Sequence, residues 1–346
     1  MTSNKLPRMG IVLSGMPPKD MLTIAQEAEE AGFYSAAAGD STHDTYAVLA
    51  AAAAVTNRIK LVSNIATWTR TPVTTARACR SLALLSGGRY ILGLGSMPRI
   101  WNENHHGISG EAMLSRMREY VELVRILWEA TPDAPVNYEG RFYRVSGYRV
   151  HEPPPHPRIP IFIGASRLRM VRETGRRADG ILFNLNYTIP WLKEQGIPAL
   201  TEGAKLGGRS LDDIEMVGFR MIRVAETSDE AEHARGVFRR QLAEVYLGLD
   251  YHRQALEAYG FGEEVAAATR AQAAGDTEGV ARAVSDRMVN TLAIIGTADE
   301  CLEQVAENTA LTDWVSLAPL TTGLPRSEAV SAARRVIHTF GGGGQR

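Results

Sequence analysis

Amide, imidazole and indole side chains gather directly after a short apolar segment, Tyr90–Leu94. The side chains of that group that could bind a ligand are Ser96, Trp101, Asn102, Asn104, His105 and His106. An apolar run bounded by glycines is typical of a buried strand in a parallel sheet. Polar groups just beyond the end of such a strand indicate a binding or catalytic loop. We expect the amides and the tryptophan to line a pocket. The histidines could transfer protons, because imidazole titrates near neutral pH, or could only form hydrogen bonds to a ligand.

A second group of polar residues lies in Gly39–Asp44, after another apolar run. Asp40 could cap the next helix or contact a ligand, and His43 could be an exposed loop residue or a proton-transfer group. Trp68 follows a third apolar run. It could pack in the core or form one wall of a pocket for an aromatic ligand.

A third candidate site is Gly164–Arg167, where a predicted strand meets a predicted helix over 166–176. Backbone N–H groups at a helix N-terminus bind anions such as phosphate. Arg167 and Arg169 in the first turn are locally unfavourable unless an anion compensates for them. The alternative interpretation is a helix capped by Ser166, with both arginines at the surface.

Three common types of site do not fit the sequence. Gly93-x-Gly95 lacks the third glycine and the helix start of a dinucleotide-binding fingerprint, although its glycines could let a flat ring lie against the backbone. The adjacent His105 and His106 have no partners at metal-ligand spacing, so we predict no metal site. No nucleophile elbow and no Ser–His–Asp order is visible.

The elements that must position these residues alternate between apolar runs and amphipathic segments. Eight strands are predicted over residues 9–14, 33–38, 59–65, 90–94, 159–164, 180–184, 214–224 and 314–317. A helix after each strand, the first of them capped by Asp20, favours a (β/α)8 TIM barrel over an open doubly wound sheet. Insertions are predicted after strands four and seven: a β-hairpin within 131–158, with Gly140 and Gly147 at its turns, and a helical region over 228–288. We expect a single domain over 1–340 and a disordered tail over 341–346.

The composition favours a cytoplasmic globular protein. The chain has 346 residues, 45% of them hydrophobic, and a formal net charge of −1, so no overall field attracts nucleic acid or an anionic membrane. The longest apolar run, Tyr46–Val55, is shorter than the ~18 residues of a membrane span. Two cysteines without metal-type spacing, and an N-terminus without a signal-peptide core, indicate a reducing compartment.

Three motifs together resemble the luciferase-like monooxygenase superfamily, whose members are flavin- and deazaflavin-dependent barrel enzymes. They are TRTP at Thr69–Pro72, LxxLSGGRxxLGLG at Leu82–Gly95, and IPIFIGA followed by ADGILFN within Ile159–Asn184. The loop WNENHHGIS, followed by MREYVELVRILW, resembles the branch that uses the deazaflavin coenzyme F420, a hydride carrier. The resemblance implies a (β/α)8 barrel with the cofactor ring at the C-terminal ends of the strands.

The resemblance also implies roles for individual residues. The cofactor ring would contact Asp40, Gly95 and Ser96, and its phosphate would bind at Gly164–Ala165, extended here by Ser166 and Arg167. A non-prolyl cis peptide bond would lie at Ser63–Asn64, behind the ring. Many members carry a histidine directly after the acidic residue that corresponds to Asp40. Because Ser41 stands there in this chain, His43, His105 and His106 are the candidates for proton transfer.

The sequence therefore predicts an oxidoreductase that transfers a hydride between coenzyme F420 and a small organic substrate. The first alternative is a monooxygenase that uses FMN and O2, with reduced flavin supplied by a separate flavin reductase. The second is a barrel that binds a cofactor without catalysis. Because family members commonly form homodimers, we also expect a homodimer.

Overall fold

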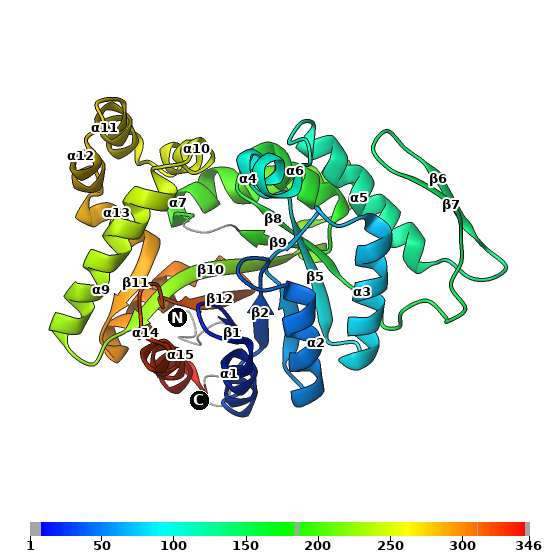
Figure 1. The fold of residues 1–346 in the computed structure, drawn as a ribbon, viewed down its shortest axis with the longest axis horizontal. Helices are drawn as coiled ribbons and strands as arrows, with labels where there is room; N and C mark the ends of the chain where they lie inside the picture. Colours follow the sequence, from blue (N-terminus) through cyan, green and yellow to red (C-terminus); the bar gives the residue numbers. More distant parts are fainter. Residues whose placement is uncertain (1–7, 184–186, 310, 343–346) are drawn as a thin grey trace. The chain divides into compact units, whose positions relative to one another are not determined.

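The computed structural model describes residues 8–183, 187–309 and 311–342, in which parallel strands and helices alternate along the chain (Figure 1). This alternation is that of the (β/α)8 TIM barrel predicted from the sequence. The chain forms two compact units. Unit 1 comprises Met1–Tyr34, Phe183–Pro198 and Val217–Arg346, and unit 2 comprises Ser35–Leu182 and Ala199–Met216.

Unit 2 is built on parallel strands that neighbour one another in chain order. They are β2 (Ser35–Ala38), β3 (Lys60–Ser63), β5 (Tyr90–Gly95), β8 (Ile161–Ala165) and β9 (Gly180–Phe183), with the short β4 (Ala66–Thr67) also paired to β5. Nearly every residue of these strands is buried. Their apolar runs follow from this burial, because parallel strands are covered on both faces.

The helices of unit 2 begin where the sequence supplies caps. They are α2 (Thr45–Val55), α3 (Pro72–Leu85), α4 (Arg99–His106), α5 (Met113–Trp128), α6 (Leu168–Arg177) and α8 (Ile197–Leu206), of which α8 has its first residues in unit 1. The Asp44 side chain accepts a hydrogen bond from the Ala47 N–H at the start of α2, and Thr71 does the same for Thr74 at the start of α3. Pro72 occupies the first helical position, where its missing N–H costs nothing.

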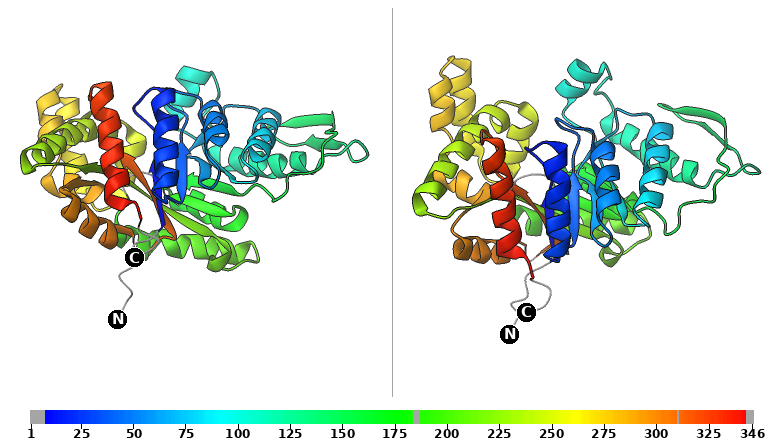
Figure 2. Two further views of the ribbon diagram at one scale, coloured as in Figure 1. Left: turned by 90° about the horizontal axis from the view of Figure 1, so that it is seen from below. Right: turned by 60° about the horizontal axis from the view of Figure 1, so that its bottom comes forward.

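Unit 1 contains the remaining parallel strands. They are β1 (Arg8–Val12), β12 (Trp314–Pro319), β10 (Glu215–Val224) and β11 (Ala293–Gly296), each paired with the next, and the first two residues of β10 belong to unit 2. Helices α1 (Pro18–Glu30) and α15 (Arg326–Phe340) lie side by side (Figure 2). Ion pairs from Arg326 to Asp20 and from Arg334 to Glu27 join the two helices.

The predicted insertion after β10 is helical. It consists of α9 (Ser228–Gln241), α10 (Asp250–Ala258), α11 (Gly262–Ala273), α12 (Thr277–Arg282) and α13 (Asp286–Leu292), and α14 (Ala298–Thr309) follows β11. The remaining helical elements of the described residues are the short α7 (Ile189–Trp191), the π-helical turns Leu192–Gly196 and Leu242–Tyr246, and the 3-10 turn Leu211–Asp213. Strand β11 was not predicted, because so short an apolar run after a helix has no period that distinguishes a strand from a helical turn.

Several local predictions were wrong. The segment after β5 is not a loop throughout, because α4 forms from Arg99 to His106 behind Pro98 and ends at Gly107. Asp20 does not cap α1, since the helix begins at Pro18, and the Asp20 carboxylate instead pairs with Arg326. In the tail, Gly341 and Gly342 are ordered, with N–H bonds to the carbonyls of Ile337 and Ala31. Residues 343–346 lie outside the described part.

The predicted hairpin is present as antiparallel β6 (Val136–Glu139) and β7 (Arg144–Tyr148), which extends beyond α3 and α5 (Figure 1). Its turn lies at Gly140–Tyr143, whereas Gly147 lies within β7, beside a register shift of the ladder. The buried Glu119 carboxylate of α5 accepts hydrogen bonds from the backbone N–H groups of Phe142 and Tyr143 at 2.8–3.1 Å. The turn is thereby bound to α5, although a two-stranded hairpin is only marginally stable by itself.

We predict that Glu119→Ala releases this hairpin. The substitution removes the acceptor of two backbone N–H groups, and each charge-assisted bond contributes about 1.5–3 kcal/mol. Amide hydrogen exchange over residues 136–148 should accelerate by at least about tenfold, while exchange in β3 and β5 stays slow. Glu122→Ala, an exposed position of the same helix, is the control and should leave exchange unchanged. Equal acceleration in both variants would contradict this role of Glu119.

Candidate active site

The C-terminal ends of four strands of unit 2 carry the predicted site residues. Gly39 and Asp40 follow β2, Asn64 and Ile65 follow β3, Ser96 follows β5, and Ser166 follows β8. Because neighbouring parallel strands end at the same edge of a sheet, these positions lie along one edge. This edge is the candidate active site.

An ion pair between Asp40 and Arg70 joins the end of β2 to the segment before α3. Arg70 Nη1 lies 2.5 Å from Asp40 Oδ2, and Nη2 lies 3.0 Å from Oδ1. Asp40 also accepts hydrogen bonds from the N–H groups of Thr67 at 2.8 Å and Thr45 at 3.1 Å. Asp44, at the start of α2, shares the guanidinium, 2.5 Å from Nη2. Asp40 therefore links the end of β2 to β4, to α2 and to the segment before α3.

These bonds set the protonation state of Asp40. Burial by itself would raise the pKa of the carboxyl, but hydrogen bonds from Arg70, Thr67 and Thr45 outweigh burial, so the pKa lies below its ordinary value. Asp40 is thus an ionised carboxylate at neutral pH, and both oxygens accept bonds from the protein. This arrangement suits a group that positions the site and does not suit a general acid.

The end of β3 contains the predicted cis peptide bond, one residue later than expected. The bond joins Asn64 to Ile65, so the prediction of Ser63–Asn64 was wrong. The reason is the sheet register: the Asn64 N–H still donates to the Ala38 carbonyl at 2.8 Å, and the Ile65 carbonyl then accepts from the Asp40 N–H at 2.9 Å. The Ser63 hydroxyl points into the core, 2.5 Å from the Tyr90 hydroxyl, and Asn64 is half-buried.

The two glycines of β5 are packed against this strand end. A Cβ at Gly93 would lie 1.9 Å from the Ser63 carbonyl oxygen, and one at Gly95 would lie 1.8 Å from Ile65 Cδ1. The two glycines therefore leave room for the end of β3 to pack against β5. This differs from the interpretation that a flat ring lies directly on the glycines. The half-buried Ile65 side chain covers Gly95 and also borders Gly164, where a Cβ would lie 3.0 Å from Ile65 Cγ2. Sequence reasoning missed Ile65 because nothing in its type marks it.

Trp68 and Asn102 are bonded to each other inside unit 2. Trp68 Nε1 donates to Asn102 Oδ1 at 3.1 Å, and Asn102 Nδ2 donates to the Ser96 carbonyl at 2.7 Å. Asn102 is fully buried and Trp68 is 3% exposed. The structure thus places these two predicted pocket residues behind the segment after β5, where they hold Ser96 in position.

The other polar residues of α4 are spread over its surface. Trp101 is half-buried, and Asn104, His105 and His106 are exposed, the two histidines in the last turn of the helix. His43 is half-buried, in the connection between β2 and α2 that also contains Asp40. The three histidines therefore occupy two different elements, and His43 is the one that shares a strand end with Asp40.

The predicted anion-binding segment joins β8 to α6. Ala165 and Ser166 are buried, Gly164 is half-buried and Arg167 is exposed. Helix α6 begins at Leu168 with Arg167 as its N-cap, so Ser166 is not the cap. An arginine side chain has no acceptor atom with which to cap a helix, and no acidic residue lies in the first turn. The backbone at the start of α6 thus fits an anionic group.

Side chains of the hairpin turn contact the candidate active site in two places, through Arg116 and through Tyr120 of α5. The sequence indicated neither contact. The Arg116 guanidinium lies between two rings, with its Cζ atom 5.0 Å from the centre of the Phe142 ring and 5.1 Å from that of Trp68. Tyr143 packs edge-on against Tyr120, whose hydroxyl donates to the Arg70 carbonyl at 3.1 Å. Helix α5 thereby connects the hairpin to both the Asn102 side and the Asp40 side of the site.

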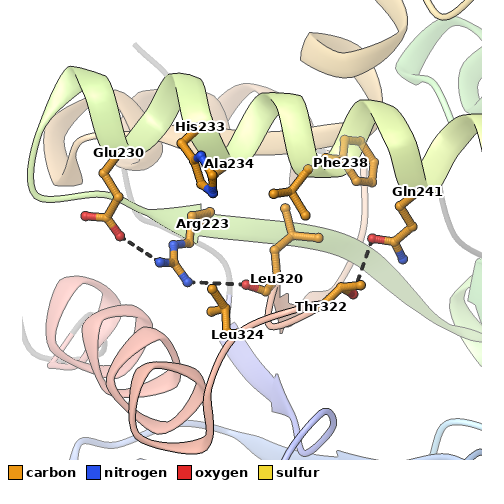
Figure 3. A pocket seen from close by; sticks show the side chains of 10 residues that line it. Arg223, Glu230, His233, Ala234, Phe238, Gln241, Leu320, Thr322 and Leu324 are labelled. Carbon is orange, nitrogen blue, oxygen red and sulfur yellow. Dashed lines mark hydrogen bonds and ion pairs between the residues drawn. The ribbon is translucent and has the colours of Figure 1, made fainter. Parts of the chain in front are cut away.

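In unit 1, the strand end at Arg223 forms a small separate pocket (Figure 3). Arg223 Nη2 lies 2.7 Å from Glu230 Oε1 of α9, and Nη1 donates to the Leu320 carbonyl at 3.4 Å. Burial raises the pKa of Glu230, but the Glu226 N–H and the guanidinium groups of Arg223 and Arg335 hold it below its usual value. The pocket volume of about 40 Å³ has room for water but not for a cofactor ring.

Two further observations limit the kind of site. No group of three histidine, cysteine or acidic side chains that could hold a metal ion is present in the described residues. Among the described helices, none combines the length and apolarity that a membrane crossing requires.

A family model described as luciferase-like monooxygenase matches residues 3–313. This chain belongs to the luciferase-like monooxygenase family. It is therefore an oxidoreductase, as the resemblance implied, and the alternative of a barrel without catalysis is not supported.

Individual relatives agree with this assignment. An uncharacterized protein of Mycobacterium tuberculosis is 31% identical over 83% of this chain and 86% of its own length. The 5,10-methylenetetrahydromethanopterin reductase of Archaeoglobus fulgidus is 30% identical over 81% of this chain and 83% of its own. The coenzyme F420-dependent tetrahydromethanopterin reductase of Methanopyrus kandleri has a similar solved structure, with a TM-score of 0.71, 24% identity, and coverage of 95% of this chain and 97% of that one. This likeness confirms the (β/α)8 fold.

We predict that Asp40→Asn lowers the free energy of unfolding by about 2 kcal/mol at pH 7, because it leaves a partly buried guanidinium with a weaker partner. The pKa of Asp40 is lowered by folding, so its stabilisation is present above the unfolded-state pKa and is lost as the pH falls through the folded-state pKa. Urea unfolding should therefore show a difference that shrinks below about pH 4. Asp44→Asn keeps its capping oxygen and is the control, with a smaller effect. A pH-independent loss would contradict this role of Asp40.

We also predict that Asn102→Leu destabilises the segment after β5. Leucine is γ-branched like asparagine, although larger, and it leaves the buried Trp68 N–H and the Ser96 carbonyl without partners, at a cost of about 1–3 kcal/mol each. The melting temperature should fall, and the Trp fluorescence should change. Asn104→Leu, at an exposed position of the same helix, should leave both unchanged, and equal effects in the two variants would refute this assignment.

Proposed function

We propose that this protein transfers a hydride between coenzyme F420 and a small organic substrate. The observation that carries the proposal is the chemistry of its relatives at about 30% identity. The F420-dependent glucose-6-phosphate dehydrogenase of Nocardia farcinica is 33% identical over 229 residues, 61% of this chain and 66% of its own. The reductase of Archaeoglobus fulgidus is a second relative whose name describes a reduction.

The residues of the candidate site fit such a cofactor. Ile65, lying over Gly95 and Gly164, offers an apolar seat for a flat ring, and Ser96 lies at the end of the neighbouring strand. The uncapped start of α6 at Gly164–Arg167 would hold a phosphate group. When bound, F420 would supply or accept the hydride according to its oxidation state, while the protein orients ring and substrate.

Arg167 is the arginine that we propose for the anionic part of the cofactor. Arg167 directly follows the Gly164–Ser166 segment, is the N-cap residue of α6 and is exposed.

For proton transfer we propose His43 ahead of His105 and His106. His43 is half-buried and shares the end of β2 with Asp40, which is fixed by Arg70. His105 and His106 are exposed at the end of α4. Trp101 and Asn104 stay candidates for contacts with the substrate.

The second candidate function is an FMN-dependent monooxygenase that receives reduced flavin from a separate flavin reductase. The description of the matching family favours it. The same strand ends and the same start of α6 would serve FMN. The homodimer also stays a prediction, which light scattering of the purified protein checks.

Fluorescence titration with each cofactor tests the proposal. We expect saturable binding of F420 and weaker binding of FMN, followed by a change of F420 absorbance when a substrate of a broad alcohol, aldehyde and sugar phosphate panel is added. Arg167→Glu should weaken F420 binding by more than about tenfold, since tenfold corresponds to only about 1.4 kcal/mol. Lys205→Glu, an equal change of charge on exposed α8, is the control. FMN binding without any response to F420 would contradict the proposal and favour the monooxygenase.

A further inference from the structure

An arginine-lined pocket lies at the N-terminal ends of the strands of unit 2, opposite to the strand ends that form the candidate active site. Arg158 precedes β8, and Asp179 directly precedes β9. The open pocket has a volume of about 580 Å³, and every side chain that lines it is charged. The lining arginines are Arg125, Arg158, Arg176, Arg177 and Arg209, and the lining acids are Asp179 and Asp213. Five arginines against two aspartates leave a formal excess of three positive charges.

The two aspartates are already engaged and do not neutralise this excess. Asp179 Oδ1 pairs with Arg158 at 2.5 Å, and its Oδ2 accepts from Arg125 and from the Ile161 N–H, each at 2.8 Å. Asp213 Oδ2 accepts from the N–H of Ser210 at 2.8 Å and from its hydroxyl at 3.1 Å. The Asp179 carboxylate is thus shared by two arginines, and the Asp213 carboxylate is bonded to Ser210 in a backbone turn.

The remaining arginines have little or no countercharge. Arg209 donates to two neutral carbonyls, those of Ala178 at 2.6 Å and Asp213 at 2.7 Å. Arg177 pairs with Glu173, a carboxylate that Arg118 also uses. Arg176 is exposed and has no ion-pair or hydrogen-bond partner among the residues that the structure describes.

Mutual repulsion is visible at Arg125. Burial lowers the pKa of its guanidinium, and the charges of Arg158 and Arg209 lower it further, against the attraction of Asp179. Bonds to the carbonyls at the end of α6 explain why Arg125 and Arg209 are present. These carbonyl bonds do not explain why Arg158 and Arg176 line the same pocket.

We propose that this pocket binds a small molecule with several closely spaced anionic oxygens, of the class of polyphosphates and polycarboxylates. Arginine presents paired N–H donors that match phosphate and carboxylate oxygens, and a multivalent anion relieves the repulsion among the five guanidinium groups. The site is separate from the proposed cofactor segment at Gly164–Arg167 and does not depend on the proposed function.

Calorimetric titration of the full chain with inorganic pyrophosphate tests the proposal, and citrate in a second titration distinguishes phosphate from carboxylate ligands. We expect one saturable site whose affinity falls at least tenfold in the double variant Arg158→Ala/Arg176→Ala. A rise in melting temperature with pyrophosphate should disappear in the same variant. Lys19→Ala/Arg270→Ala removes two exposed cations of unit 1 and should bind like the parent protein.

Arg167→Glu separates this site from the proposed cofactor segment and should leave pyrophosphate binding unchanged. Binding that is lost in Arg167→Glu but kept in the double variant would overturn the proposal. Binding that never saturates, or that is the same in all variants, would also overturn it, because that is the result for an adventitious ion only. If the double variant fails to fold, Arg176→Ala alone, which removes no hydrogen bond or ion pair with the described residues, must reduce the affinity.

Discussion

The ion pair between Asp40 and Arg70 is the interaction on which the candidate active site depends. It lies where β2 ends, and through Thr67, Thr45 and Asp44 it fixes the end of β4 and the start of α2. The carboxylate is partly buried, which raises its pKa, but the guanidinium and two backbone N–H groups hold the pKa below its ordinary value. Asp40 is thus a fixed negative charge at the end of β2, which favours a positioning role for it over proton exchange.

Close packing at the end of β3 is the second constraint. Gly93 and Gly95 have no side chains because the Ser63 carbonyl and the Ile65 side chain occupy that space. The Ile65 side chain therefore rests on β5, and the ring of a flavin or deazaflavin would meet Ile65 before it meets the glycines. Helix α5 and the hairpin hold the surrounding segments through Arg116, Tyr120 and Glu119.

The two edges of the unit 2 sheet differ in charge. At the C-terminal edge, Arg70 is matched by Asp40 and Asp44, and the start of α6 supplies backbone donors. At the N-terminal edge, arginines exceed aspartates, and Arg176 has no partner among the described residues. The first edge therefore suits a cofactor that carries a neutral ring and an anionic tail, while the second suits a compact anion.

The sequence by itself determined the rhythm of strands and helices, and hence the (β/α)8 fold and the strand ends that carry the site, because hydrophobic period and capping residues act locally. It also indicated the family, through motifs such as Leu82–Gly95. Only the tertiary structure decided that Asn102 is bonded to Trp68, that Asp40 is bonded to Arg70, and that the cis peptide bond follows Asn64. Each of these depends on residues far apart in the chain or on the register between strands, and the period of a single segment carries no information about either.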